Sequence, residues 1–258
     1  MAEPPSGGTG LANIRAQVCV NNGMAKSAST LLCHYTIRLL QRAFPRNGVA
    51  TLEQATGDGS IRGISCFVES LNTETLPLIE GIAREQGPVL VKIHAPVHAF
   101  LQESLDSGRI RMVTTFRDPR DVILSAMDHA RRTRGTPQAV FQEFTSVEDS
   151  IPHVRWWAEM ALGWKASGMS YMVRYENIYD DPAAVLGQVA AHYGIPADEP
   201  AIEAVVAEER ATRAYAANQF NKGLRRRFPA EMSPEQVALC NECLGDCIQA
   251  LGYPLELS

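Results

Sequence analysis

One lysine and three hydroxyl side chains lie together in the segment Lys26-Ser27-Ala28-Ser29-Thr30. The segment follows a short apolar run, Val18-Cys19-Val20, and opens an apolar-periodic stretch from Leu31 to Leu40. A strand that turns into a helix gathers unpaired backbone N–H groups at the positive end of the helix dipole. Such a turn attracts anions, and a lysine in it suits a phosphate or sulfate group. For this turn taken alone, a capped helix start with a solvated lysine is the simpler alternative.

The rest of the chain alternates apolar, β-rich runs with helical patterns, which is typical of an α/β fold with a parallel sheet and helices on both faces. We predict strands over Gln17–Asn22, Ile64–Val68, Val89–Ile93, Ile110–Phe116 and Ser170–Val173. We predict helices over Ser29–Ala43, Thr75–Glu85, Pro119–Arg132, Val147–Ala166, Pro182–Tyr193, Glu199–Tyr215 and Pro234–Leu251. Three of them begin with a capping residue before a proline, at Asp118, Asp181 and Ser233.

Basic residues follow the ends of several predicted strands. Lys92 and His94 stand two residues apart at one strand end, so their side chains project to the same face. Arg117 follows the next strand, and Arg174 with Tyr175 follows the last. In an open α/β sheet, ligands bind beyond the carboxyl ends of the strands. A basic edge on a chain whose net charge is −5 therefore predicts a polyanionic ligand.

The bulk composition narrows the function classes. The 258 residues are compatible with one large domain, predicted over residues 16–258 after a small, polar, disordered tail over residues 1–15. An overall negative charge gives no sign of a nucleic-acid or anionic-membrane partner, and no apolar run is long enough to span a bilayer. The tail lacks the features of a signal peptide, so we expect a cytoplasmic protein.

Six cysteines are present, and three of them recur at helical spacing: Cys240, Cys243 and Cys247. Three cysteines with no nearby fourth ligand make a poor zinc site. Buried structural thiols in a reducing compartment are the favoured interpretation, and we expect no metal.

Four motifs and their order identify a family resemblance. KSAST after the first strand, KIHAP, RDPRDVILS and RYENI together resemble the sulfotransferases that use 3′-phosphoadenosine 5′-phosphosulfate (PAPS). A later segment, Asn221-Lys222-Gly223-Leu224-Arg225, resembles the family's RKG element. The matched elements run in family order from about residue 18 to 252. The resemblance implies a P-loop-NTPase-like sulfotransferase architecture and an enzyme that releases adenosine 3′,5′-bisphosphate (PAP).

The resemblance also implies roles for particular residues. Lys26, with the turn's amides and the hydroxyls of Ser27, Ser29 and Thr30, would hold the 5′-phosphosulfate. His94 would be the general base, and Lys92 would balance charge on the leaving nucleotide, as Lys26 also would. Arg117 and Ser125 would bind the 3′-phosphate, and Tyr175 would approach the adenine. Lys222 and Gly223 would add late contacts to the 3′-phosphate.

Two departures from the family pattern matter. Leu31 stands where the family often has a tryptophan that stacks on the adenine, and Phe220 is a weak substitute. Asn221 stands where the family usually has arginine, and Arg225, Arg226 or Arg227 could compensate. That arginine run could equally be a solvated loop.

The acceptor is not readable from the sequence: an alcohol, a phenol or an amine would serve. Segments 48–58, 128–144 and 218–229 are expected to wall its pocket, and whether the protein forms a homodimer stays open. Candidate lining residues, each at least as compatible with an ordinary core position, are Phe44, Phe67, His98, Phe100, His129, Phe141 and Trp156. Two other functions remain as alternatives: a P-loop kinase or nucleotide hydrolase, which the imperfect Walker spacing disfavours, and an inactive nucleotide-binding module.

Overall fold

A computed structural model describes residues 18–48, 68, 71–136, 139–213 and 226–256. Its four strands, β1 (Val18–Gly23), β2 (Val89–Lys92), β3 (Ile110–Phe116) and β4 (Ser170–Arg174), form one parallel sheet in the order β2-β1-β3-β4. Val18 pairs with Val89 on one side and with Ile110 on the other. The predicted strand Ile64–Val68 lies outside the described residues except for Val68, whose N–H donates to the carbonyl of Lys92.

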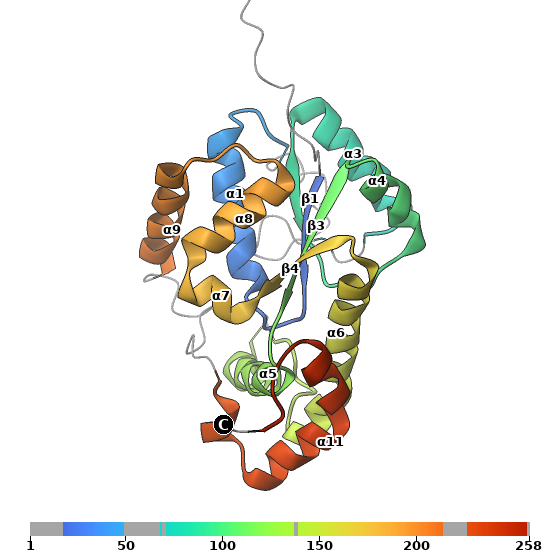
Figure 1. Ribbon diagram of the computed structural model, residues 1–258, viewed down its shortest axis with the longest axis vertical. Coiled ribbons are helices and arrows are strands. Elements are labelled where there is room, and N and C mark those ends of the chain that lie inside the picture. The colour runs from blue at the N-terminus through green and yellow to red at the C-terminus, as the bar shows by residue number, and fades with distance from the viewer. Residues whose placement is uncertain (1–17, 49–67, 69–70, 137–138, 214–225, 257–258) are drawn as a thin grey trace, which may run out of the picture.

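Helices connect and flank the strands (Figure 1). Their bounds are α1 (Ser29–Ala43), α3 (Thr75–Gln86), α4 (Gln102–Asp106), α5 (Pro119–Thr133), α6 (Val147–Ser167), α7 (Tyr175–Asp180), α8 (Pro182–Tyr193), α9 (Glu199–Arg213), α10 (Phe228–Glu231) and α11 (Pro234–Ala250), with a 3-10 turn η1 (Ala99–Leu101). The seven predicted helices are confirmed to within two residues at their described ends. The short α4, α7 and α10 were not predicted, because one or two turns carry too little periodicity.

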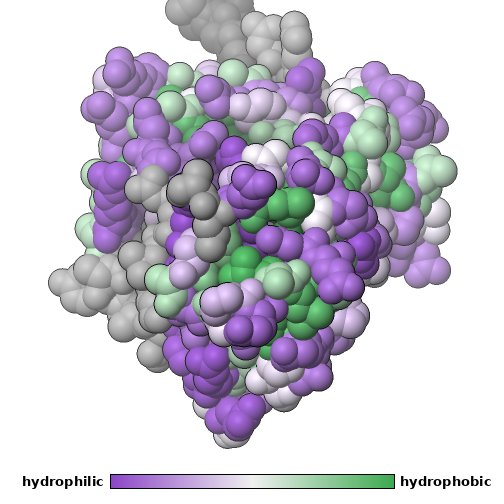
Figure 2. Space-filling model, turned by 60° about the horizontal axis from the view of Figure 1, so that its bottom comes forward, coloured by the Kyte–Doolittle hydropathy of each residue, from purple (hydrophilic) through white to green (hydrophobic). Residues whose placement is uncertain are grey.

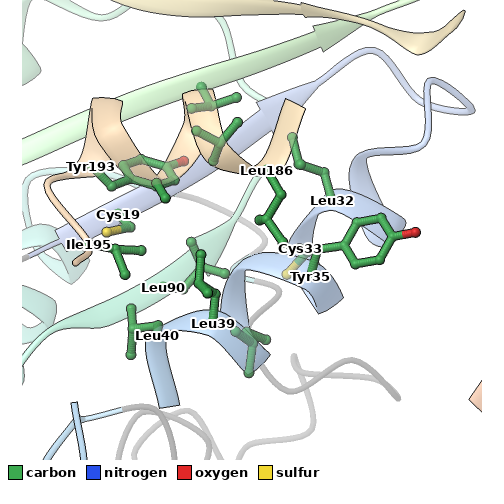
Figure 3. Packing of buried hydrophobic residues seen from close by; sticks show 14 of the residues in the cluster. Cys19, Leu32, Cys33, Tyr35, Leu39, Leu40, Leu90, Leu186, Tyr193 and Ile195 are labelled. Atoms are coloured by element: carbon green, nitrogen blue, oxygen red, sulfur yellow. The ribbon is translucent and has the colours of Figure 1, made fainter. Parts of the chain in front are cut away.

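The two faces of the sheet bury alternate residues of the strands. Cys19 of β1 packs with α1, α8 and α9, whereas its neighbours Val18 and Val20 pack with α3 and α6. Figure 3 shows the first of these clusters, where Leu32 and Leu186 face each other and Tyr193 closes one end. The chain is thus a single α/β domain with helices on both faces of its sheet, as predicted.

A third cluster of buried apolar residues lies beyond the carboxyl ends of the strands, among α5, α6 and α11. This end is the lower one in Figure 1. Cys240 and Cys247 of α11 are buried in the cluster and Cys243 is half-buried, and the thiols of all three are free. Burial raises the pKa of Cys240 to about 12, so that thiol is a neutral packing group.

Proline-led helix starts are capped as the sequence predicts. The side chains of Asp118, Asp181 and Ser233 accept hydrogen bonds from backbone N–H groups in the first turns of α5, α8 and α11. α1 differs, because its N-cap residue is Ala28, which has no side-chain oxygen. The N-terminus of α1 is therefore left without a side-chain cap, next to the predicted anion site.

Candidate active site

The β1–α1 turn departs from ordinary backbone geometry. Lys26 and Ala28 have φ angles of 63° and 64°, in the left-handed region that non-glycine residues seldom occupy. Each such residue costs on the order of 1–2 kcal/mol. Met24 anchors the turn by donating its N–H to the carbonyl of Thr115 on β3. The turn is held in a shape that lays its backbone across the end of the sheet, where an anion could be bound.

The serine that follows Lys26 serves the turn itself. The side chain of Ser27 is fully buried, and its hydroxyl donates to the carbonyl of Met24 at 2.6 Å and lies 2.7 Å from Oγ1 of Thr115. This geometry opposes the expectation that the Ser27 hydroxyl contacts the ligand. Ser29 is also buried, and Thr30 is half-buried at the start of α1.

Lys92 and His94 lie together as their spacing predicts. Nζ of Lys92 is 2.9 Å from Nε2 of His94, and Nδ1 of His94 is 2.6 Å from the carbonyl oxygen of Gly23. An ammonium group can only donate and a carbonyl can only accept. His94 therefore carries its proton on Nδ1 and presents the lone pair of Nε2 to Lys92.

Burial lowers the pKa of His94 to about 3, with the charges of Lys92 and then Lys26 adding to the effect. The imidazole is thus neutral throughout the physiological range. A base of such low pKa accepts a proton poorly, so His94 in this state is orientated but not yet basic.

A residue that sequence reasoning did not single out positions this strand end. Asn22 on β1 donates through Nδ2 to the carbonyl of Ala95 and accepts from the N–H of Ala95. Nε1 of Trp164 donates to the same carbonyl at 2.8 Å. The signal in the sequence was a pair of asparagines ending an otherwise apolar strand, because a buried amide needs partners.

Arg117 follows β3 and is buried, with 3% of its surface exposed. Its guanidinium lies 3.0 Å from Asp121 and stacks 3.8 Å from the ring centre of Tyr175, the first residue of α7. Its Nη1 also reaches the carbonyl of Lys26 at 3.5 Å. In this structure Arg117 is therefore paired with a carboxylate, and Ser125, the other predicted ligand of the 3′-phosphate, is buried in α5.

Asp121 connects Arg117 to the start of α10. One carboxylate oxygen accepts from Arg117, and the other accepts from the N–H groups of Arg227 and Phe228 at 2.9 and 3.0 Å. Arg227 itself pairs with Asp128 and Glu231. The sequence left open whether the run Arg225-Arg226-Arg227 is a solvated loop. Arg227 is buried and belongs to this network of ion pairs instead. Lys222, Gly223 and Asn221 lie outside the described residues.

Three cationic side chains, from α5 and from the ends of β3 and β2, act on Lys26. Burial and, after it, the charges of Arg132, Arg117 and Lys92 together lower the pKa of Lys26 to about 8, against the opposing charge of Asp128. Arg132, on α5, was not among the predicted site residues. A polyanion bound here would relieve this repulsion, so the residues present fit a ligand that carries phosphate and sulfate groups.

Some expectations about the acceptor pocket are not met. Trp156 is 48% exposed on α6 and Phe44 belongs to the core beside α1, so neither lines a pocket at this site. His98 stacks on Phe100 beside the 3-10 turn η1. Phe67 lies outside the described residues, as do most of 48–58 and much of 218–229. Within the described part of the chain, no group of three or more His, Cys, Asp or Glu side chains could hold a metal ion.

Comparison with known protein families identifies the family of this chain. The model of the sulfotransferase domain matches residues 24–234, which include the β1–α1 turn, His94 and Arg117. The chain belongs to the sulfotransferase family. Mouse sulfotransferase 4A1 is 25% identical over 176 residues, and the human protein of that name is 26% identical over 175. Each match covers 63% of this chain, and the chain spans 62% and 61% of the length of these relatives.

Solved structures of other proteins share the fold. Retinol dehydratase in a complex with retinol and PAP superposes with a TM-score of 0.55 at 16% identity, over 95% of this chain and 84% of that one. Mouse sulfotransferase SULT7A1 complexed with PAP gives a TM-score of 0.57 at 13% identity, over 90% and 87%. At such low sequence identities, the structural similarity shows only that this chain has the same fold.

Proposed function

We propose that this protein is a sulfotransferase that moves the sulfuryl group of PAPS to a hydroxyl or amine of a small acceptor. The observation that carries the proposal is the convergence of Lys26, Lys92 and Arg117 beside a neutral, orientated His94. Family membership and the PAP bound to two structural relatives support the choice of nucleotide. The acceptor and the cofactor's contacts are inferred from the residues.

Separate sets of residues would bind the 5′-phosphosulfate and the 3′-phosphate of the donor. Lys26, the amides of the β1–α1 turn and the hydroxyls of Ser29 and Thr30 would hold the 5′-phosphosulfate. Arg117 would receive the 3′-phosphate, since a guanidinium offers paired donors that match phosphate oxygens. Ser125 would assist, and Tyr175, which already stacks on Arg117, would border the adenine. Lys222 and Gly223 remain proposed contacts of the 3′-phosphate, and no metal is required.

PAPS supplies an activated sulfuryl group whose sulfur–oxygen bond to the 5′-phosphate breaks as the acceptor oxygen bonds to sulfur. Nε2 of His94 takes the acceptor's proton, and Lys92 and Lys26 balance the negative charge left on the phosphate oxygen. No covalent enzyme intermediate is needed. Alignment of the reactants and charge balance supply most of the acceleration.

Without ligand, Lys92 donates a hydrogen bond to Nε2 of His94, so the donor must bind before His94 can accept a proton. An anion beside Lys92 draws its ammonium away from Nε2 and so exposes the lone pair that must accept the proton. The same anion cancels the two lysine charges that, in addition to burial, lower the pKa of His94. Binding of the donor therefore turns an orientated imidazole into a better base, closer to the pKa that proton transfer at neutral pH requires.

The surface around the strand ends suits a small, partly apolar acceptor. Figure 2 brings that end of the molecule forward and shows hydrophobic residues in the middle of the face with hydrophilic ones around them. A structural relative, retinol dehydratase, forms complexes with retinol and with androsterone. We propose a small organic alcohol, phenol or amine for this chain.

The alternatives are less well supported. A kinase or nucleotide hydrolase needs carboxylates for Mg²⁺, yet Asp118 pairs with the fully buried Arg120 and Asp121 pairs with Arg117. An inactive binding module would keep the cations but would not need the fixed tautomer of His94. None of the described helices is long and apolar enough to cross a membrane. We propose a reducing, cytoplasmic location on the free thiols at Cys19, Cys33, Cys240, Cys243 and Cys247.

Calorimetry with PAP, adenosine 5′-monophosphate and ATP, with and without Mg²⁺, tests the nucleotide, and radiolabelled PAPS with a panel of acceptors tests the transfer. We expect PAP to bind more tightly than the monophosphate and without Mg²⁺. Tighter binding of ATP with Mg²⁺ contradicts the proposal. Tight PAP binding with no transfer to any acceptor supports the inactive module instead.

A further inference from the structure

Lys26 has a hydrogen-bond partner outside the turn that contains it. Its Nζ lies 3.2 Å from Nδ1 of His129, which is 103 residues away on α5. Because an ammonium group has no lone pair, Nδ1 is the acceptor and His129 carries its proton on Nε2. The half-buried imidazole is neutral, since burial and the charges of Lys26 and Arg132 lower its pKa to about 4.

The ring of His129 is itself held in place. Phe141 meets it edge-on at 5.4 Å between ring centres, and the same phenylalanine lies 5.7 Å from Nζ of Lys26. Phe141 has a φ angle of 60°, which is strained for a bulky residue, and it packs edge-on against Phe144 and Trp157. Such a conformation persists only where the surroundings determine it, so this aromatic group sets where His129 points.

We propose that His129 is a positioning residue for Lys26: it accepts the ammonium's hydrogen bond and keeps that group protonated and aimed over the β1–α1 turn. The proposal rests on the proposed function, because it gives Lys26 its task of meeting the phosphosulfate. His129 touches neither nucleotide nor acceptor in this role. It acts through the lysine alone.

The charges around Lys26 explain why such a partner is needed. Arg132 on α5, Arg117 at the end of β3 and Lys92 at the end of β2 all favour the neutral amine, and among the described residues Asp128 on α5 opposes them. Lys26 holds its proton poorly, with a pKa of about 8. A neutral acceptor at 3.2 Å stabilises the charged form without adding a formal charge that would repel an anionic ligand.

The chain offers a direct test because it contains only four lysines, at positions 26, 92, 165 and 222. Nuclear magnetic resonance of protein labelled with ¹³C- and ¹⁵N-lysine follows each ammonium through a pH titration, and Lys26→Arg assigns the Lys26 signal. His129→Phe keeps a ring against Phe141 and removes the acceptor. His129→Asn is the matched control, since its side-chain oxygen stands near the place of Nδ1.

We expect the pKa of Lys26 to fall by about one unit in His129→Phe and to stay near the parent value in His129→Asn. PAP affinity of the phenylalanine variant should then drop about fivefold at pH 8 and hardly at pH 6, where the lysine is charged in both proteins. An unchanged Lys26 titration in His129→Phe overturns the proposal, as does an asparagine variant that behaves like it.

The nucleotide measurement separates this proposal from the one on which it rests. A His129-dependent titration in a protein that binds no PAP supports the pairing and contradicts the proposed function. Normal PAP binding with a His129-independent titration contradicts the pairing alone. Thermal melting of both variants detects a folding defect, and if His129→Phe fails to fold, His129→Leu takes its place in the same titration.

Discussion

Two lysine–histidine pairs lie at the same edge of the sheet, and they are built differently. In the pair Lys92–His94, both nitrogens of the imidazole have partners, because Nδ1 is fixed to the carbonyl of Gly23. In the pair Lys26–His129, the imidazole receives the lysine on Nδ1 and is held by the ring of Phe141. The first pair comes from neighbouring residues of one strand end, and the second joins a turn to a distant helix.

The difference assigns different work to the two histidines. A ring whose N–H donates to a fixed carbonyl is held in one tautomer and one orientation, as a base must be. A ring held by aromatic packing, as Phe141 holds His129, is positioned well enough to aim a lysine. His94 is therefore the expected base, and His129 is expected to support Lys26.

Removing His94 should have the largest effect on catalysis. His94→Ala is expected to lower the rate of sulfuryl transfer about 10²- to 10⁴-fold while PAP affinity stays nearly unchanged, because the base acts only in the chemical step. His98→Ala is the matched control, since His98 stands four residues away and is exposed. Lost nucleotide affinity with intact turnover in His94→Ala would refute the assignment.

Removing Arg117 should change which nucleotide is bound. Arg117→Ala is expected to weaken PAP binding by about 1.5–3 kcal/mol, and the 5′-monophosphate far less, because the 3′-phosphate loses a charged partner. Calorimetry with both nucleotides measures the difference. Arg109→Ala, at a partly exposed arginine paired with Glu80 and Glu103, is the control. Equal losses for both nucleotides contradict a 3′-phosphate role.

The carbonyl that fixes His94 belongs to a residue that tolerates no side chain. A Cβ on Gly23 would stand 2.0 Å from Oγ1 and 3.0 Å from the backbone oxygen of Thr115, so Gly23→Ala must displace Thr115 or the strand that carries it. We expect a loss of about 1–3 kcal/mol in the free energy of unfolding, measured by denaturant titration. Gly81→Ala on α3 meets nothing within 4 Å and should be neutral or slightly stabilising. Similar stabilities of the two variants oppose this account.

The turn that carries Lys26 should gain from glycine. Ala28→Gly removes the steric cost of a φ angle of 64°, and the greater freedom of glycine in the unfolded chain offsets part of that gain. The net effect should be a stabilisation of about 0.5–1 kcal/mol, visible as a higher melting temperature. A destabilised Ala28→Gly protein would mean that the turn is not strained.

The sequence predicted this edge of the molecule well because its information is local. Strand ends follow from apolar runs, and the spacing of Lys92 and His94 was enough to put their side chains together. Partners across long separations were not predictable: His129 for Lys26, Asn22 for Ala95 and Asp121 for the start of α10. The buried hydroxyl of Ser27 shows the same limit, since its partner Thr115 lies on another strand.

The central claim is that a bound anion draws the ammonium of Lys92 away from Nε2 of His94 and so makes His94 a better base. Nuclear magnetic resonance of ¹⁵N-histidine, titrated without and with PAP, measures it most directly. We predict that free protein shows His94 protonated on Nδ1 with a pKa of about 3, and that PAP raises this pKa toward neutrality. A His94 protonated on Nε2, or a pKa that PAP leaves unchanged, would contradict the account.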